Sequence, residues 1–157
     1  MKLFFVMITF VLGTSYSFFN EEQIVLIDEK KLIHGDFSIC DKLNKNYFNS
    51  HGFAHSRWRW VKPSFDKIGE EYNNFDGGLS YSFDDGILST ITICFPRKDT
   101  TLRGISVGCT QYEVETAYGP PSWNAGARLI GYENIGFLIS DSLVYGIFIY
   151  DENDCED

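Results

Sequence analysis

Residues 79–87 read Leu-Ser-Tyr-Ser-Phe-Asp-Asp-Gly-Ile, and residues 135–143 read Ile-Gly-Phe-Leu-Ile-Ser-Asp-Ser-Leu. The two stretches begin 56 residues apart, their apolar positions coincide, and Asp85 falls on Asp141. In each, apolar side chains recur at every second position up to a short polar turn, which is typical of an antiparallel β-hairpin. A match at a fixed spacing predicts that the chain contains one structural unit twice.

A short helix is expected ahead of each hairpin. Residues 35–40 align with residues 104–109 at a spacing of 69, and both segments end in a cysteine. Thr110 and Glu113 then follow at the spacing of a capping box, in which each side chain binds the other residue's backbone amide. Asp41 stands at the corresponding position of the first copy and is expected to cap a helix there.

The repeat predicts an α+β fold, a tandem repeat of two small units, each a short helix packed on an antiparallel β-meander. The first unit is expected over residues 18–98 and the second over residues 99–157, where it ends in an acidic tail. The spacing falls from 69 upstream to 56 at the hairpins, so the first unit carries an insertion, which we place between Trp60 and Tyr72.

Residues 1–17 have the pattern of a secretory signal peptide. Lys2 provides a basic start, an apolar run covers residues 3–12, and Ser15 and Ser17 supply small side chains before a cleavage site. The alternative, a membrane anchor, is disfavoured because a transmembrane helix needs about 20 apolar residues. We therefore expect a secreted or periplasmic protein with no integral membrane anchor.

Export changes the interpretation of the four cysteines, because disulfides persist in oxidising compartments. Four cysteines allow three pairings, and the sequence leaves all of them open. We favour pairing within each unit, Cys40 with Cys94 and Cys109 with Cys155, because it respects the repeat. No Cys-x-x-Cys pair occurs, so a structural zinc site is not supported.

The net charge restricts the kinds of partner. Lys and Arg number 13 against 22 Asp and Glu, for a formal charge of −9, and 44% of the residues are hydrophobic. Such a chain can bury a packed core, but it has too few cations for general nucleic-acid binding. Because from Leu129 onward the acidic residues have no basic counterpart, a basic protein would be attracted to it.

Residues 51–62 form the only basic cluster in this acidic sequence. Alternation along a strand would place Arg57 and Arg59 on one face and Trp58 and Trp60 on the other. Tryptophan and arginine are enriched at the energetic centres of protein interfaces, so this segment is a candidate binding face. The alternative is that the tryptophans pack into the core while the arginines pair with nearby acids.

The loop at residues 119–126 presents Trp123 between the second helix and the strands that follow it. We expect Tyr72 and Tyr132 to flank this loop, and the three aromatic residues complete the candidate partner-binding set. Packing of Trp123 in the core is the alternative.

No constellation in the sequence indicates catalysis or a bound cofactor. His51 and His55 have the spacing of two metal ligands on a helix, but the glycine between them and the strand-like sequence beyond disfavour a helix. Glu70–Glu71 and Asp84–Asp85 are adjacent carboxylates of the type that glycosidases use, although solvated charge explains them better. His34 stands alone and is expected at the surface. We expect no enzyme, no cofactor and no metal.

Residues 103–121 follow the pattern Gly-Ile-x-x-Gly-x-Thr-x-x-Glu-Val and then Tyr-Gly-x-Pro. This pattern resembles that of the SmpA/OmlA group of small outer-membrane assembly lipoproteins, although this chain lacks their acylated cysteine. It is also similar to the β-lactamase inhibitor proteins, which are built from two helix-plus-sheet units. The resemblance implies a concave sheet that holds another protein, without a catalytic centre. The positions that carry it are Gly104, Gly108, Thr110, Val114, Gly119 and Pro121.

Together these features predict an exported, non-enzymatic protein-binding module of the inhibitor or immunity-protein type. Its expected partner is another protein, such as a basic toxin or hydrolase, whose site it would occlude. The alternative is a structural or assembly factor of the bacterial cell envelope, and a small secreted hydrolase is a third reading.

Overall fold

The computed structural model describes residues 24–62, 65–151 and 155. The expected signal peptide, residues 1–17, lies outside these residues, as does most of the acidic tail. Within the described part, no helix combines the length and the apolar character needed to cross a membrane.

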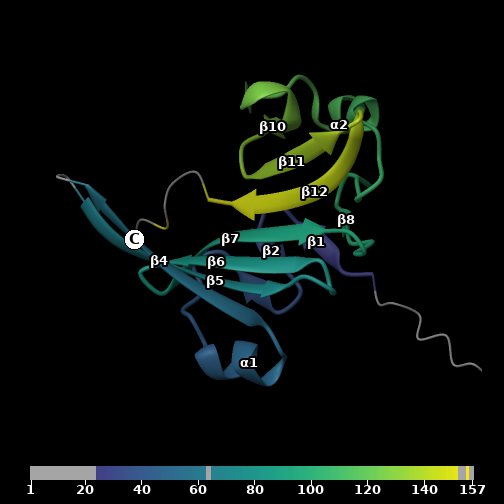
Figure 1. Cartoon of the computed structure of the whole chain (residues 1–157). Helices are drawn as coiled ribbons and strands as arrows, with labels where there is room; N and C mark the ends of the chain where they lie inside the picture. The colour runs from purple at the N-terminus through teal and green to yellow at the C-terminus, as the bar shows by residue number, and fades with distance from the viewer. Residues whose placement is uncertain (1–23, 63–64, 152–154, 156–157) are drawn as a thin grey trace, which may run out of the picture.

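The largest element of the described structure is one antiparallel sheet of eight strands (Figure 1). Neighbouring strands are joined by backbone hydrogen bonds across the whole width of this sheet. In spatial order the strands are β4 (Ala54–Lys62), β5 (Phe65–Asn74), β6 (Leu79–Asp84), β7 (Ile87–Cys94), β12 (Leu143–Tyr150), β11 (Ile135–Ser140), β10 (Leu129–Gly131) and β9 (Trp123–Asn124).

The remaining elements are short. A second, four-stranded sheet has the order β3 (Phe37–Ser38), β2 (Ile33–His34), β1 (Leu26–Asp28) and β8 (Thr100–Thr101). In it, β1 runs parallel to β8 and antiparallel to β2. The helices are α1 (Lys45–Ser50), α2 (Gln111–Tyr118) and the 3₁₀ turn η1 (Gly126–Arg128).

Both predicted hairpins are confirmed, β6 with β7 and β11 with β12. Each closes with two residues at positive φ, Asp85–Gly86 at 50° and 83° and Asp141–Ser142 at 50° and 64°. This is the primed turn geometry that matches the twist of a hairpin. The register also shifts at equivalent places, between Ser82 and Phe83 and between Leu138 and Ile139. The spacing of 56 therefore reports a real local likeness of the two hairpins.

The predicted fold class, a tandem repeat of two helix-on-meander units, is wrong. The described part of the chain is mostly β-structure with two short α-helices. Residues 90–94 of β7 pair with residues 146–150 of β12 in one continuous sheet. A separate four-stranded meander would leave a long edge strand without backbone partners. Pairing the two inner edges removes both edges and joins the two halves into one core.

The capping box of α2 is confirmed, because the Thr110 Oγ1 accepts from the Glu113 amide and a Glu113 carboxylate oxygen accepts from the Thr110 amide. The expected cap of α1 is wrong. Asn44 caps that helix, and the Asp41 carboxylate instead accepts a hydrogen bond of 2.6 Å from the amide of Ser38.

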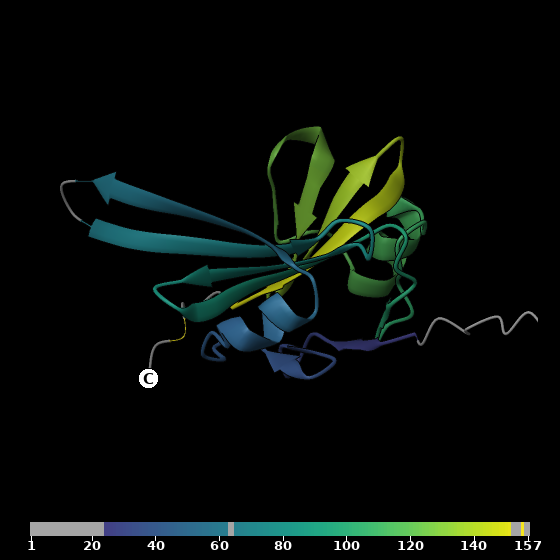
Figure 2. The same ribbon diagram turned by 60° about the horizontal axis from the view of Figure 1, so that its bottom comes forward.

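The core lies on one face of the eight-stranded sheet. Phe48 of α1 packs on Tyr72 and Phe83, and Tyr118 of α2 packs on Phe137. Figure 2 shows both helices and the four-stranded sheet on this same side. The opposite face carries no layer among the described residues. Fully buried isoleucines fill the centre between the two halves: Ile91, Ile93, Ile147 and Ile149.

One disulfide joins Cys40 to Cys155, and Cys94 and Cys109 are reduced thiols. The expected pairing of Cys40 with Cys94 and Cys109 with Cys155 is therefore wrong. Cys94 lies on the uncovered face, with its Sγ against Gly146, whereas Cys109 packs against the core. The sheet separates these two thiols. A disulfide still indicates an oxidising, exported location.

Candidate functional site

One row of paired residues crosses the uncovered face of the eight-stranded sheet, which we call the open face. Residues opposite each other in adjacent strands share a face, so this register defines which side chains point away from the core. Every member of the row with a side chain is half-buried except the exposed Ala54, as expected for a sheet face without cover. In spatial order the row is Ala54, Asn73, Ser80, Thr92, Phe148, Gly136, Gly131 and Trp123.

Aromatic side chains occupy one end of the open face and are held in place by glycines and hydrogen bonds. A Cβ at Gly131 would lie 2.1 Å from the Trp123 ring, so the indole lies directly on the backbone. The Trp123 Nε1 donates to the Tyr150 hydroxyl at 2.9 Å, and that hydroxyl donates to the Tyr132 carbonyl. Phe148 stacks on Tyr150, with their ring centroids 5.5 Å apart. These rings are thus ordered before any partner arrives.

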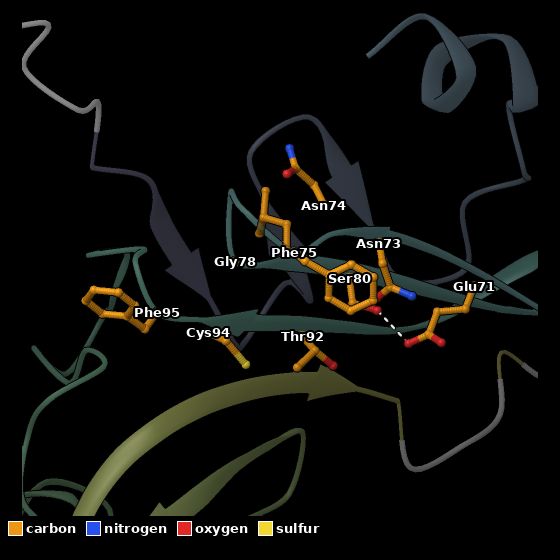
Figure 3. Close-up of a pocket in the computed structure, with 10 residues that line it drawn as sticks. Glu71, Asn73, Asn74, Phe75, Gly78, Ser80, Thr92, Cys94 and Phe95 are labelled. Carbon is orange, nitrogen blue, oxygen red and sulfur yellow. Dashed lines mark hydrogen bonds between the residues drawn. The ribbon is translucent and has the colours of Figure 1, made fainter. Parts of the chain in front are cut away.

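A groove of about 410 Å³ lies at the other end of the open face (Figure 3). Two exposed rings border it, Phe75 from the loop after β5 and Phe95 from the loop after β7, at 76% and 78% exposure. Inside it, the Ser80 hydroxyl donates to the Glu71 carboxylate at 2.8 Å. The lining also includes Asn73, Asn74, Gly78, Leu79, Thr92 and Cys94.

The predicted Arg–Trp segment is the edge strand β4, and the hairpin of β4 and β5 projects beyond the rest of the sheet (Figure 2). Arg57 and Arg59 are exposed. The backbone of Trp58 pairs with Gly69, and that of Trp60 pairs with Lys67. The side chains of both tryptophans lie outside the described part of the structure, so the choice between a binding face and core packing stays open for them.

The other three aromatic residues of the predicted binding set, Tyr72, Trp123 and Tyr132, do not lie together on one surface. Tyr72 and Tyr132 lie in the core, 1% and 6% exposed, and burial raises the pKa of both phenols. The Tyr132 hydroxyl donates to the Gly119 carbonyl at 3.0 Å. Trp123 alone of these three reaches the open face. Alternation along β5 puts Tyr72 on the core side, between Glu71 and Asn73 of the open face.

The carboxylates of Glu70 and Glu71 point to opposite faces of β5 and do not converge on one site. Glu70 lies on the core side, 6% exposed, and binds the Lys45 Nζ at 2.9 and 3.1 Å and the His55 Nε2 at 3.0 Å. The hydrogen bond from Lys45 is the main cause that lowers the pKa of Glu70, and burial opposes it. This cluster ties α1 to β4 and β5.

The two histidines considered as metal ligands have different partners. The Nδ1 of His51, at the end of α1, lies 2.8 Å from the Tyr47 carbonyl oxygen, whereas His55 binds Glu70. Among the described residues, the group of potential metal ligands that the geometry assembles is Cys40, Asp151 and Cys155. The disulfide already engages both of its sulfurs.

A buried ionic cluster next to the four-stranded sheet was not indicated by any sequence motif. His34, expected at the surface, is 2% exposed, and its Nε2 lies 2.8 Å from Asp99, which is 1% exposed. Asp99 also accepts two hydrogen bonds from Arg97 and one from the Val25 amide. Burial raises the pKa of Asp99, but these hydrogen bonds outweigh it and lower the value to about 2. His34 and Val25 are too far from Asp99 in sequence for a motif to reveal the cluster.

Comparisons with known proteins give information about the fold only. No protein-family model matches the chain, and no curated protein matches it. The structure is similar to the crystal structure of the uncharacterized protein YfeY from Escherichia coli, with a TM-score of 0.51 and 13% identity. The match covers 82% of this chain and 99% of that chain. At this identity the likeness shows a shared fold and nothing about activity.

Proposed function

We propose that the protein is an exported, non-enzymatic binding module that holds a partner protein against its open face. The observation that carries this proposal is the asymmetry of the eight-stranded sheet. One face buries the core, and the other presents an ordered aromatic cluster and a groove with no covering layer in the described residues.

The aromatic end of the open face has the properties of an interface centre. Trp123, Phe148 and Tyr150 offer large apolar rings with few rotatable bonds, and residues of this kind dominate binding energy at protein interfaces. Because glycines and hydrogen bonds already fix these rings, binding loses little side-chain entropy. The aromatic surface that a partner would contact is therefore already ordered before binding.

Charge favours a basic partner. The chain has a formal charge of −9, and opposite charge on a partner accelerates encounter and disfavours acidic competitors. A basic toxin or hydrolase whose site is occluded by the open face fits these properties, as in the inhibitor or immunity-protein type.

The experiment is capture of a partner by the immobilised chain, residues 18–157, from extracts of its own cells and of competing cells. Thr90→Arg places a long side chain on the open face, where Thr90 is half-buried beside Tyr150. Thr116→Arg makes the same change on the exposed side of α2. We expect Thr90→Arg to abolish capture of the specific partner and Thr116→Arg to retain it.

Two outcomes would overturn the proposal. In the first, the folded chain retains no partner at low salt. In the second, Thr90→Arg and Thr116→Arg retain the same partner equally, which would place the interface away from the open face. Circular dichroism of each variant checks that both remain folded.

A further inference from the structure

We propose that the groove between Phe75 and Phe95 binds a lysine or arginine side chain of the partner protein, with Glu71 as its counter-ion. This inference rests on the proposed function and specifies which side chain the open face recognises. It assigns the groove to one chemical class, a flexible apolar stem that ends in a cation.

Glu71 supplies an unneutralised negative charge inside the groove. Its carboxylate accepts one hydrogen bond, from the Ser80 hydroxyl, and a carboxylate has room for about four. No lysine, arginine or histidine of the described residues forms an ion pair with it, and none lines the groove. The free acceptor sites of Glu71 are therefore available to a donor that enters from solvent.

The neighbouring residue on the same strand shows the contrast. Glu70, on the core side of β5, already has Lys45 and His55 as partners within 3.1 Å. Among the described residues, an internal cation thus neutralises one of the two adjacent carboxylates and not the other. The unneutralised one is the carboxylate that faces the groove.

Phe75 and Phe95 suit the stem and the charge of such a side chain. Phenyl faces attract cations, and the methylene groups of lysine and arginine pack on apolar surface while the charged head stays polar. Both rings are more than three-quarters exposed, whereas other phenylalanines of the chain, such as Phe48 and Phe83, fill the core. In Figure 3, Glu71, Asn73 and Ser80 lie toward one end of the groove and Phe95 lies at the other.

The two loops that carry these rings are locked to each other. The Cys94 amide donates to the Gly78 carbonyl at 2.7 Å, and a Cβ at Gly78 would lie 2.3 Å from the Cys94 carbonyl oxygen. Gly78 also has a positive φ of 66°, which glycine adopts without strain. The backbones that carry the two rings are therefore fixed relative to each other. The groove does not need to form on binding.

An apolar side chain in the same groove would remove water from Glu71 and provide no partner in return. Burying an unpaired charge is strongly unfavourable, so the groove discriminates against apolar side chains as well as favouring basic ones. A second carboxylate would add repulsion. Lysine or arginine satisfies the charge and the rings together.

The test is a two-dimensional NMR titration of ¹⁵N-labelled chain, residues 18–157, with the peptide acetyl-Gly-Lys-Gly-amide. Its norleucine analogue keeps the stem and removes the charge. We expect saturable shifts of the Gly78, Ser80 and Thr92 amides with the lysine peptide and at least tenfold weaker binding of the norleucine peptide. Glu71→Gln keeps an acceptor for Ser80, and we expect it to weaken lysine-peptide binding about tenfold.

Two further variants complete the design. Glu133→Gln removes one exposed carboxylate elsewhere and is the matched control for charge, with unchanged affinity expected. Phe75→Ala with Phe95→Ala truncates two exposed rings, so it tests the groove without disturbing the core, and we expect weaker binding again. Equal affinity for the lysine and norleucine peptides, or for Glu71→Gln and the unchanged chain, would overturn the assignment.

The two proposals fail in different ways. If Thr90→Arg abolishes partner capture while Glu71→Gln changes neither capture nor peptide affinity, the open face is the interface and the groove assignment is wrong. If the groove binds the lysine peptide in a Glu71-dependent manner while the chain captures no partner, the groove assignment holds and the proposed function fails.

Discussion

Phe148 of β12 lies directly on Gly136 of β11, so closely that a Cβ at position 136 would be 1.9 Å from the ring's Cζ. The glycine is paired with Phe148 in the antiparallel register and is buried. The absence of a side chain at one position thus decides where an aromatic ring of the open face lies.

Gly136→Ala is expected to destabilise the protein, because the methyl group must displace the Phe148 ring. Overpacking of this kind costs about 1–3 kcal/mol. Urea unfolding followed by fluorescence measures the change. In the background of Phe148→Ala, the same substitution should cost much less, since the ring is gone. Equal costs in both backgrounds would contradict the packing relationship.

The disulfide between Cys40 and Cys155 has a sequence separation of 115. In the chain-entropy model a loop of this length contributes about 5 kcal/mol by restricting the unfolded chain. Cys155→Ser should therefore lower the free energy of unfolding by several kcal/mol, whereas Cys94→Ser should change it little. Peptide mapping under non-reducing conditions provides the direct check. A bridge that contains Cys94 or Cys109 would contradict the structure.

Acid should weaken the contacts of the small sheet through Asp99. Its pKa in the folded state, about 2, lies below the ordinary 3.8, so the folded state binds protons less readily than the unfolded state. The resulting stability, about 2 kcal/mol, is present above pH 4 and is lost as the pH falls from 4 toward 2. Denaturant unfolding between pH 5 and pH 2 should show this loss. Asp99→Asn should be less stable at pH 5 and should lack this component of the acid dependence.

The two hairpin turns provide a matched pair of substitutions. Asp85 and Asp141 share a φ of 50°, but the Asp85 carboxylate also accepts from the Ile68 amide at 2.9 Å. Replacing either with alanine puts a less tolerant residue at positive φ. Asp85→Ala also removes the hydrogen bond between this turn and β5, so it should cost about 1 kcal/mol more than Asp141→Ala. Thermal unfolding of the two variants measures the difference, and equal costs would argue against a role for that hydrogen bond.

Alkylation of the Cys94 thiol, which lines the groove, measures whether the groove is accessible or occupied. Burial raises the pKa of the Cys94 thiol, so less thiolate is present at pH 8 and alkylation by iodoacetamide should be slower than in the unfolded chain. The lysine peptide should slow it further by occupying the groove. Mass spectrometry of the Cys94 peptide measures both rates. Labelling that is as fast in the folded as in the unfolded chain would show that the thiol is not shielded.

Local features could be predicted from the sequence because neighbouring residues carry them. The hairpins at 79–94 and 135–150, their polar turns and the capping box of Thr110 depend on residues within a few positions of one another. These elements follow from φ/ψ preference, side-chain alternation and capping chemistry, which act over short distances in the chain.

Long-range choices were decided by the tertiary structure. Pairing of β7 with β12 merged the two expected units, and it follows from satisfying two exposed strand edges at once. The same merger places Cys94 and Cys109 on opposite faces, brings Cys155 to Cys40, and buries Tyr72 and Tyr132 while leaving Trp123 on the open face. The sequence by itself determined the two hairpins, their turns and the start of α2. Which strand edges pair and which sheet faces are covered depends on segments far apart in the chain. A local sequence pattern therefore does not predict these contacts.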